Sequence, residues 1–454
     1  MQLTFLGATQ TVTGSRYLLR CETGWMLVDC GLFQGYKHLR LKNWARPLFD
    51  LSTLNAVVLT HAHLDHSGYL PLLVKQGFRG PIYATPPTID LCRILLPDSG
   101  HLQEEQAEFA NRHGFSKHSP ALPLYTERDA TECLKHFEPI WFEEVFEPVP
   151  DIRVHYSRAG HLLGAGSIRI ESASTSVLFS GDLGRPADPL MSAPEPPPSA
   201  DYVVVESTYG DRKHPALDSQ NELRDVIRRT CERRGIVVIP TFAVGRAQLL
   251  LLLIARLKAA RAIPDIPVYL DSPMAIDATE LLTRHAAEHR FSPSDAASIG
   301  RTARLVRTAE ESKSLDRIRE PAIILAASGM ATGGRVVHHL KMFVTDARNT
   351  ILFSGFQAGG TRGASLVAGA RELRIHGETF PVRAEVCQLQ SASAHADADE
   401  VIAWLRQLQT APRQVFVTHG ESSASDALRQ RIQSELNWTA SVPEYRDEVE
   451  LAKD

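Results

Sequence analysis

The sequence lacks the features that mark several specialised classes of protein. Its six cysteines form no C-x-x-C pair or cluster, which argues against a disulfide scaffold and favours reduced thiols in the cytoplasm. The most apolar run, residues 249–254, is far shorter than the roughly 20 residues of a membrane span. Residues 1–14 do not have the pattern of a signal peptide. We therefore expect a soluble, cytoplasmic protein that does not bind a membrane.

A large excess of charge of one sign is also missing. The chain has 49 Lys and Arg against 53 Asp and Glu, for a formal net charge of −4. This balance gives no overall attraction to nucleic acid, so any basic contact surface must be local. The length of 454 residues exceeds one ordinary domain, so two or three domains are expected.

The local pattern of the chain changes twice. Up to about residue 208, short apolar strands are separated by glycine-rich turns. From 209 to 369, strands alternate with helices, which predicts a parallel sheet with helices on both faces. From 370 to 454 the strand pattern returns, beginning with a strand over 382–389. Solvated surface helices are expected over 220–234 and 296–319.

A dense group of potential metal ligands follows the buried strand predicted over 56–59. His61, His63, Asp65 and His66 occupy four of six consecutive positions. Imidazole and carboxylate are ligand types that zinc prefers. Because such a composition rarely follows a core strand by chance, the segment predicts a metal site.

Three distant residues lie in a similar setting, at a predicted strand end near glycine. They are His161, Asp182 and His419. Each alone is a weak signal, but together they supply enough ligands for two zinc ions, with a carboxylate as the natural bridge. Two cations roughly 3.5–4 Å apart suit phosphoryl chemistry, because they can activate a bridging hydroxide and stabilise the leaving oxygen.

At this point the motifs are recognisable. The His-x-His-x-Asp-His run, with Asp29, His161 and Asp182, resembles the metallo-β-lactamase superfamily. Glu206 in Val-Val-Glu-Ser-Thr-Tyr-Gly, His395 in Ser-Ala-Ser-Ala-His-Ala-Asp, and His419 resemble the three later motifs of the β-CASP nucleases. The chain is similar over nearly its whole length to bacterial and archaeal homologues of the nuclease subunit of the mRNA cleavage and polyadenylation factor.

The resemblance implies an α/β fold, a metallo-β-lactamase αββα sandwich with an inserted Rossmann-like parallel β-CASP domain. The change of pattern agrees with a sandwich formed by 1–208 and 370–454 and an insertion over 209–369. No N-terminal module of the KH type is expected, because the sequence opens on a lactamase-like strand.

The resemblance also implies a role for each matched residue. The expected ligands are His61, His63, His161 and Asp182 for a first zinc ion, and Asp65, His66, Asp182 and His419 for a second. Asp29 would orient the site from behind, and Asp65 is counted with the catalytic residues. His395 would contact the scissile phosphate while Glu206 holds it by a hydrogen bond, a pairing that fixes the tautomer of an imidazole and favours its charged form.

Small-residue loops follow the predicted strands of the inserted domain. Glycines in such loops let a phosphate backbone approach closely, and arginines can bind phosphate in a forked geometry. A single loop of this kind is more simply a tight turn, but four of them favour an RNA-binding surface, on which Phe242 or Phe356 could stack on a base. The predicted RNA contacts are Ser328, Gly329, Thr332, Arg335, Gln357, Arg362, Arg246, Ser391 and Ser393.

The leading hypothesis is a zinc-dependent ribonuclease with two Zn²⁺ ions that hydrolyses single-stranded RNA, leaving a 5′-phosphate and a 3′-hydroxyl. A DNA nuclease of the same family is the first alternative, and His419 favours RNA because DNA-cutting relatives commonly carry an apolar residue there. A small-molecule hydrolase is the second, and the inserted domain and the His395–Glu206 pair argue against it. A scaffold without activity is the third, and the full ligand set argues against it. Association with further copies of the chain is left open.

Overall fold

The chain forms two compact units. The computed structural model describes residues 1–114, 116–215, 218–389, 391 and 393–451. Unit 1 combines Met1–Lys213 with His395–Asp454, and unit 2 is His214–Ala394. Unit 1 is therefore built from two stretches of sequence that the residues of unit 2 separate.

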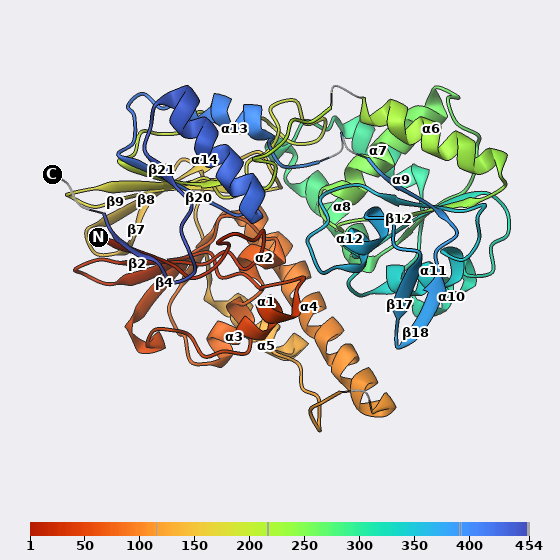
Figure 1. Cartoon of the computed structure of the whole chain (residues 1–454), viewed down its shortest axis with the longest axis horizontal. Helices are drawn as coiled ribbons and strands as arrows, with labels where there is room; N and C mark the ends of the chain where they lie inside the picture. Colours follow the sequence, from red (N-terminus) through yellow and green to blue (C-terminus); the bar gives the residue numbers. More distant parts are fainter. Residues whose placement is uncertain (115, 216–217, 390, 392, 452–454) are drawn as a thin grey trace. The chain divides into compact units, whose positions relative to one another are not determined.

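Unit 1 contains two seven-stranded sheets packed face to face (Figure 1). The first sheet has the spatial order β22 (Glu448–Glu450), β1 (Gln2–Phe5), β2 (Tyr17–Arg20), β3 (Trp25–Val28), β4 (Leu54–Val58), β5 (Ile82–Ala84) and β6 (Phe137–Pro139). The second has the order β21 (Ala440–Ser441), β20 (Gln414–Thr418), β11 (Tyr202–Glu206), β10 (Ser176–Phe179), β9 (Gly166–Glu171), β8 (Ile152–Arg158) and β7 (Val145–Val149). Apolar side chains from both sheets interdigitate between them, among them Phe5, Phe179 and Phe416.

Helices cover the outer face of each sheet of unit 1. The helices are α1 (Lys37–Lys42), α2 (Leu64–Ser67), α3 (Leu70–Lys75), α4 (Pro86–His113), α5 (Glu127–Cys133), α13 (Ala398–Leu405) and α14 (Ser422–Leu436). Trp404 of α13 and Leu428 of α14 pack on Val203 of the second sheet, whereas α2 to α5 lie beyond the first sheet (Figure 1). This layering is the αββα sandwich that the family resemblance implies.

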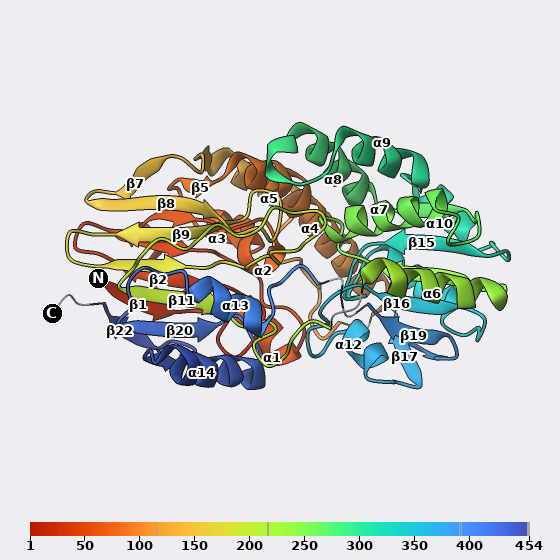
Figure 2. The same ribbon diagram turned by 90° about the horizontal axis from the view of Figure 1, so that it is seen from above.

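Four neighbouring strands of the second sheet, β10, β11, β20 and β21, run parallel. β10, β11 and β20 lie side by side, with Phe179 opposite Val204 and Glu206 opposite Thr418 (Figure 2). All five residues of β11 are buried, as expected for a strand covered on both faces. Because the strands are parallel, the loops that follow them emerge at one edge of the sheet, where chemistry can be assembled.

Unit 2 is built on a parallel six-stranded sheet. Its order is β14 (Arg304–Leu305), β13 (Val268–Asp271), β15 (Ala322–Ala326), β12 (Ile236–Pro240), β16 (Thr350–Phe353) and β19 (Glu385–Gln388). Between β16 and β19 in the sequence, β17 (Glu372–Ile375) and β18 (Glu378–Pro381) form an antiparallel hairpin. The helices are α6 (Ser219–Glu232), α7 (Arg246–Ala259), α8 (Pro273–Arg284), α9 (Pro293–Thr302), α10 (Ala309–Leu315), α11 (Arg335–Phe343) and α12 (Arg362–Val367). Figure 1 shows α6 and α7 on one side of this sheet and α10 and α11 on the other.

Two local expectations differ from the structure. The chain returns to unit 1 at His395 rather than at residue 370, because the strand that begins the third segment, β19, pairs in parallel with β16 of unit 2. The helix expected over 296–319 is divided into α9 and α10 by β14, whose Leu305 pairs with Leu270. Both differences come from pairing between residues distant in sequence, which the local pattern does not contain.

Candidate metal centre

The His-rich segment leaves the first sheet at the carboxyl end of β4. The strand is mostly buried, and His63 precedes α2 as its N-terminal flanking residue while Asp65 and His66 lie in its single turn. His61 is fully buried and His66 nearly so. The strand end and the short helix together therefore direct His61 and His66 into the interior of unit 1.

The distant candidates arrive from the second sheet. Asp182 follows β10, His419 directly follows β20, and His161 lies in the connection between β8 and β9. His419 has a φ of 49°, and its amide donates to the carbonyl of Ala8. Because β10 and β20 flank β11 in parallel, Asp182 and His419 lie at the same sheet edge.

One group of four donor atoms has the spacing of a tetrahedral zinc site. His63 Nδ1 lies 3.1 Å from His61 Nε2 and 3.2 Å from His161 Nε2. Asp182 Oδ2 lies 3.4 Å from His61 Nε2 and 3.6 Å from His161 Nε2. Four ligands bound to one zinc ion at 2.0–2.2 Å lie roughly 3.3–3.6 Å apart. These four residues therefore fit the first zinc site that the resemblance implies.

A second group uses the other oxygen of the same carboxylate. Asp182 Oδ1 lies 3.2 Å from His66 Nε2, which in turn lies 3.1 Å from His419 Nε2. Asp65 Oδ2 is 3.6 Å from His419 Nε2. The two oxygens of Asp182 thus face separate groups of nitrogen donors.

The centre contains polar atoms that the rest of the described chain leaves unmatched. Asp182 Oδ1 is buried and accepts no hydrogen bond from the residues that the structure describes. His161 Nδ1 is likewise buried without a hydrogen-bond partner among the described residues. Buried polar groups without a partner are costly, and cations shared by these atoms would remove that cost.

Burial keeps most of the first group neutral. It lowers the pKa of His61 to about 3, with the neighbouring His66 adding to the effect. Burial likewise lowers the pKa of His63 to about 4 and holds the pKa of His161 well below its usual value. A neutral imidazole is the form that binds a metal ion.

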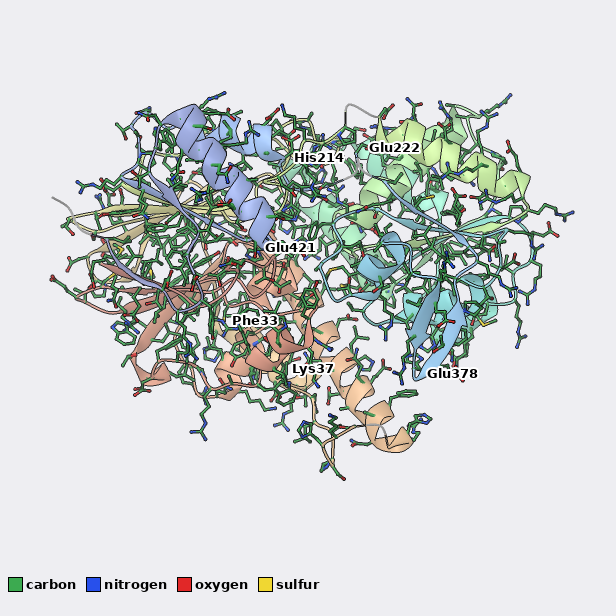
Figure 3. All side chains as sticks on the ribbon, viewed as in Figure 1. Phe33, Lys37, His214, Glu222, Glu378 and Glu421 are labelled. Carbon is green, nitrogen blue, oxygen red and sulfur yellow. The ribbon has the colours of Figure 1, made fainter. Side chains whose placement is uncertain are left out.

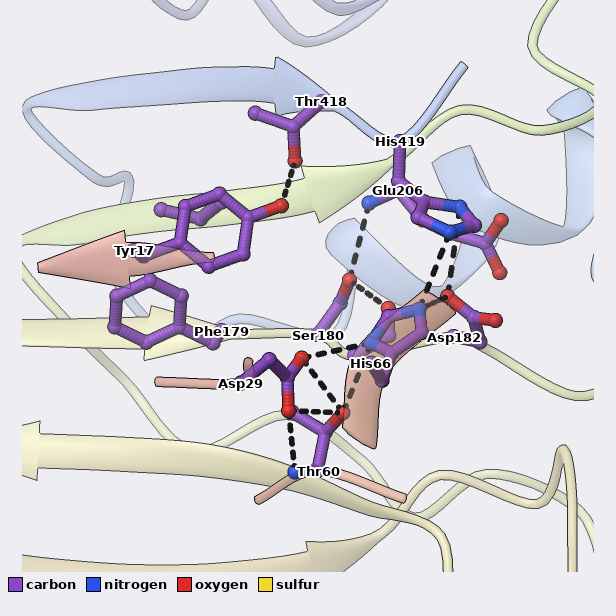
Figure 4. A pocket seen from close by; sticks show the side chains of 12 residues that line it. Tyr17, Asp29, Thr60, His66, Phe179, Ser180, Asp182, Glu206, Thr418 and His419 are labelled. Carbon is purple, nitrogen blue, oxygen red and sulfur yellow. Dashed lines mark hydrogen bonds and ion pairs between the residues drawn. The ribbon is translucent and has the colours of Figure 1, made fainter. Parts of the chain in front are cut away.

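Asp29 holds His66 from behind (Figure 4). Its Oδ2 lies 2.7 Å from His66 Nδ1, and its Oδ1 accepts from the amide of Thr60 at 2.7 Å. Burial disfavours a charged His66, but the Asp182 and Asp29 carboxylates outweigh it and hold the pKa of His66 well above its usual value. Asp29 therefore fixes the proton on Nδ1 and directs Nε2 at the second group, the role of an outer carboxylate behind a ligating histidine.

His395 and Glu206 form a pair next to the donor groups. His395 Nδ1 lies 3.1 Å from both Glu206 oxygens and 4.0 Å from Asp182 Oδ2. Glu206 also accepts from the amide of Leu183 at 2.6 Å, which fixes its position at the end of β11. Burial opposes the charged form of His395, but the Glu206 and Asp182 charges raise its pKa to about 9.

Comparisons with known proteins agree with this geometry. Three family models match: the metallo-beta-lactamase superfamily over residues 11–90, the Beta-Casp domain over 247–366, and the Zn-dependent metallo-hydrolase RNA specificity domain over 379–443. The protein named ribonuclease TTHA0252 from Thermus thermophilus is 37% identical over 442 residues, which cover 94% of this chain and 95% of that one.

The chain belongs to the β-CASP nuclease family. It is a metal-dependent hydrolase of that family.

More distant β-CASP relatives carry a different name. The transcription termination factor FttA from Methanosarcina mazei is 33% identical over 457 residues, covering 96% of this chain and 69% of that one. A solved structure of a protein from Enterococcus faecalis V583 shares the fold, with a TM-score of 0.50 and 13% identity over 99% of both chains. Among the described residues, no helix has both the length and the apolar character of a membrane span.

The β-CASP motifs did not point to two threonines that organise the ligands. Thr60 Oγ1 donates to Asp29 and lies 3.1 Å from His61 Nδ1. Thr208 Oγ1 lies 3.1 Å from His419 Nδ1. Both are buried, and each lies two residues after the end of a core strand. For Thr60, its position directly before the predicted ligand His61 was the signal available in the sequence.

The predicted RNA contacts of the β-CASP insertion lie in loops at the carboxyl ends of β12, β15 and β16 and are joined to one another. Gln357 Nε2 donates to the carbonyl of Gly329 at 3.2 Å. Arg362 Nη1 donates to the carbonyl of Thr332 at 3.0 Å, and the hydroxyl of Ser328 lies 3.0 Å from that of Thr332. The arginine and glutamine therefore hold the loops in place.

Other predicted contacts in unit 2 have partners of their own. Arg335 Nη1 donates to Asp271 Oδ1 at 2.6 Å, and Arg246 is largely buried at the start of α7. The hydroxyl of Ser391 donates to Glu222, and Ser393 is buried. Contact between these residues and RNA stays a prediction.

Proposed function

We propose that this β-CASP enzyme is a zinc-dependent ribonuclease that hydrolyses phosphodiester bonds of single-stranded RNA. The observation that carries the proposal is the position of Asp182, whose two carboxylate oxygens face two separate groups of histidine donors. A carboxylate shared in this way suits two cations close together, the arrangement that favours phosphoryl transfer.

The chain offers a complete set of ligands for two ions. They are His61, His63, His161 and Asp182 for one ion, and Asp65, His66, Asp182 and His419 for the other. When bound, the two zinc ions would supply the Lewis acidity that activates a water and offsets the charge of the phosphodiester. Asp29 and Thr60 hold His66 and His61 in orientation, so the ligand geometry is set before substrate arrives.

His395 is assigned the contact with the phosphate that is cut. Glu206 engages its Nδ1, which fixes the tautomer and directs the Nε2–H toward a non-bridging phosphate oxygen or the leaving oxygen. The positive charge that Glu206 favours would then oppose the negative charge that grows in the transition state.

RNA rather than DNA is proposed as the substrate for two reasons. His395 and His419 fall within the match to the RNA specificity domain. A relative matched over 94% of this chain and 95% of its own length is named a ribonuclease. The loops that contain Ser328, Gln357 and Arg362 are assigned the binding of the RNA backbone, since their glycines and amides suit close approach of phosphate.

A product time course tests the proposal. Single-stranded RNA and DNA of the same sequence would be labelled at either end and incubated with the enzyme, with the enzyme plus a chelator, and with chelated enzyme after zinc is restored. We expect cleavage of RNA to 5′-phosphate and 3′-hydroxyl products, its loss with chelator and its return with zinc. Preference for DNA, or cleavage that survives the chelator, would contradict the proposal.

A further inference from the structure

A short segment of unit 1 outside the metal centre carries an unusual combination of charge and exposed aromatic surface. Residues 30–49 contain no Asp or Glu, while Lys37, Arg40, Lys42 and Arg46 lie within ten positions of one another. The whole chain, in contrast, has a net charge of −4. We call residues 36–48 the basic aromatic segment; Figure 3 labels Phe33, just before it, and Lys37 within it.

The outward face of this segment is apolar and cationic together. Tyr36 is 51% exposed, Leu41 55% and Trp44 58%. Lys37 and Arg40 are exposed as well. Because α1 and the turn after it continue the helical hydrogen bonding as far as Ala45, positions 37, 40, 41 and 44 lie on one side, at the i, i+3, i+4 and i+7 spacing.

The cations of this face are not used within the protein. Among the ion pairs of the described residues, none involves Lys37, Arg40 or Arg46, whereas Arg20 and Arg153 of the same unit each face a carboxylate. A large aromatic exposed next to unpaired cations is costly to leave in water and suits a ligand with both planar rings and negative charge.

Other residues of the segment anchor it, so that the face is held in place. Lys42 Nζ lies 3.7 Å from the centre of the Tyr445 ring and 5.1 Å from that of Phe33. The side chain of buried Asn43 donates to the carbonyl of Phe33 and accepts from its amide, at 2.8 and 2.9 Å. The segment is thus a fixed surface, which lowers the entropy lost on binding.

The residues just before the segment contact α2, the helix that carries Asp65 and His66. The amide of Cys30 donates to His66 at 2.7 Å, and that of Leu32 donates to Leu64 at 2.9 Å. Gly31 is pressed against the backbone of Asp65, where a Cβ would lie 1.6 Å from its carbonyl oxygen. Lys37 follows Leu32 by five residues, so its Cα lies within about 18 Å of that of Leu32.

We propose that the basic aromatic segment binds single-stranded RNA outside the metal centre. A base stacks on Trp44, and the backbone phosphates on either side pair with Lys37 and Arg40. This inference rests on the proposed function, since it extends the path of the same substrate. A second copy of the chain fits the face less well, because a two-fold interface would bring the same cations opposite one another.

Binding of an uncleavable RNA tests the assignment without depending on catalysis. The zinc-loaded enzyme would be titrated into a fluorescent 2′-O-methyl oligonucleotide of about 20 nucleotides, long enough to extend beyond one binding module. Trp44→Ala should weaken binding about 5- to 100-fold, the effect of removing one stacked base. Trp141 is similarly exposed in the same unit, at 55%, so Trp141→Ala should bind as wild type does.

A charge variant separates phosphate contact from stacking. Lys37→Glu with Arg40→Glu should lower the slope of log affinity against log salt by roughly 1.4, since each contact with a single strand contributes about 0.7. Arg128→Glu with Lys117→Glu makes the same change in net charge at two other exposed positions of unit 1 and should leave the slope unchanged. For single-stranded RNA as substrate, the Trp44 variant should raise KM and leave kcat unchanged.

Two results would overturn the inference, and a third would separate it from the proposed function. Equal affinity of Trp44→Ala and wild type would remove the segment from the RNA path. Sedimentation that shows a wild-type dimer and a Trp44→Ala monomer, with RNA affinity unchanged, would make the face an interface between copies. A wild type that binds the oligonucleotide through Trp44 but cleaves no RNA would retain this inference and contradict the proposed function.

Discussion

Both units bury a cluster of histidine and acidic side chains, and only one cluster is suited to metal. In unit 2, His339 Nε2 lies 2.7 Å from Asp271 Oδ2 and its Nδ1 lies 3.1 Å from Asp316. Asp271 also pairs with Arg335 at 2.6 Å and accepts from Ser312 at 2.5 Å. Every donor there meets an acceptor.

The cluster in unit 1 is arranged in the opposite way. Nitrogens face nitrogens across 3.1–3.2 Å, as between His61 and His63 or His66 and His419. Asp182 Oδ1 also faces His66 Nε2 at 3.2 Å without the geometry of a hydrogen bond. From residue types alone, both clusters would be predicted to bind a metal ion. The comparison teaches that convergence of like atoms, and not the number of histidines, distinguishes a metal centre from a buried ion pair.

The sharpest test of this difference removes the shared carboxylate. Asp182→Ala should lose metal at both positions, because it contributes one oxygen to each donor group. Activity should fall on the order of 10³-fold or more, since a catalytic metal supplies several kcal/mol. Metal analysis after dialysis measures the first effect and RNA cleavage the second; a variant that keeps two zinc ions would break the bridging assignment.

His395 tests where the metal centre ends. It lies beside the donors but pairs with Glu206, so His395→Ala should retain both metal ions while kcat falls about 10²–10⁴-fold, the usual effect of losing a proton-donating side chain. Steady-state kinetics and metal content on the same preparation measure both. Loss of either ion would show that His395 is itself a metal ligand.

Asp271→Ala is the counterpart in unit 2. It should leave the metal content unchanged and destabilise the protein by about 3–5 kcal/mol, because His339 and Arg335 lose their buried partner. Urea unfolding followed by circular dichroism measures the loss. Asp277→Ala is the control: its exposed carboxylate pairs with Arg307 at 3.0 Å and should cost less than about 1 kcal/mol. Loss of zinc from the Asp271 variant would contradict the comparison.

The smallest expected effect is a pH dependence of the cluster in unit 2. Burial opposes a charged His339, but Asp271 and Asp316 outweigh it and raise its pKa above 6.5. Its stabilising contribution is therefore complete below pH 6.5 and is lost as the pH rises through the raised pKa, with a slope of at most about 1.4 kcal/mol per pH unit. The difference in unfolding free energy between wild type and His339→Gln, measured from pH 5 to 9, should shrink with rising pH. A constant difference would show that His339 is neutral in the fold.

The metal centre could be predicted from sequence because its ligands follow strands closely. His61, Asp182 and His419 each lie within three residues of a strand end, and the other ligands of the His-rich segment follow His61 directly. Parallel strands bring such ends together. The pairing of β19 with β16 could not be predicted, because it depends on contacts across 35 positions, as between Thr350 and Glu385. The pairing of Arg335 with Asp271 could not be predicted either, because an arginine in a loop can bind phosphate and carboxylate equally well.

The split of unit 1 has a consequence for how the enzyme is made. The pairing of β11 cannot be completed until β20, its neighbour in the sheet, has been synthesised, and β20 begins at Gln414. At synthesis rates of about 5–20 residues per second, the ribosome needs roughly 10–40 s to pass from Glu206 to Gln414. Throughout that interval the nascent chain lacks His419, and for most of it the chain also lacks His395. A growing copy therefore has no complete set of ligands with which to cut RNA, including the messenger from which it is being translated.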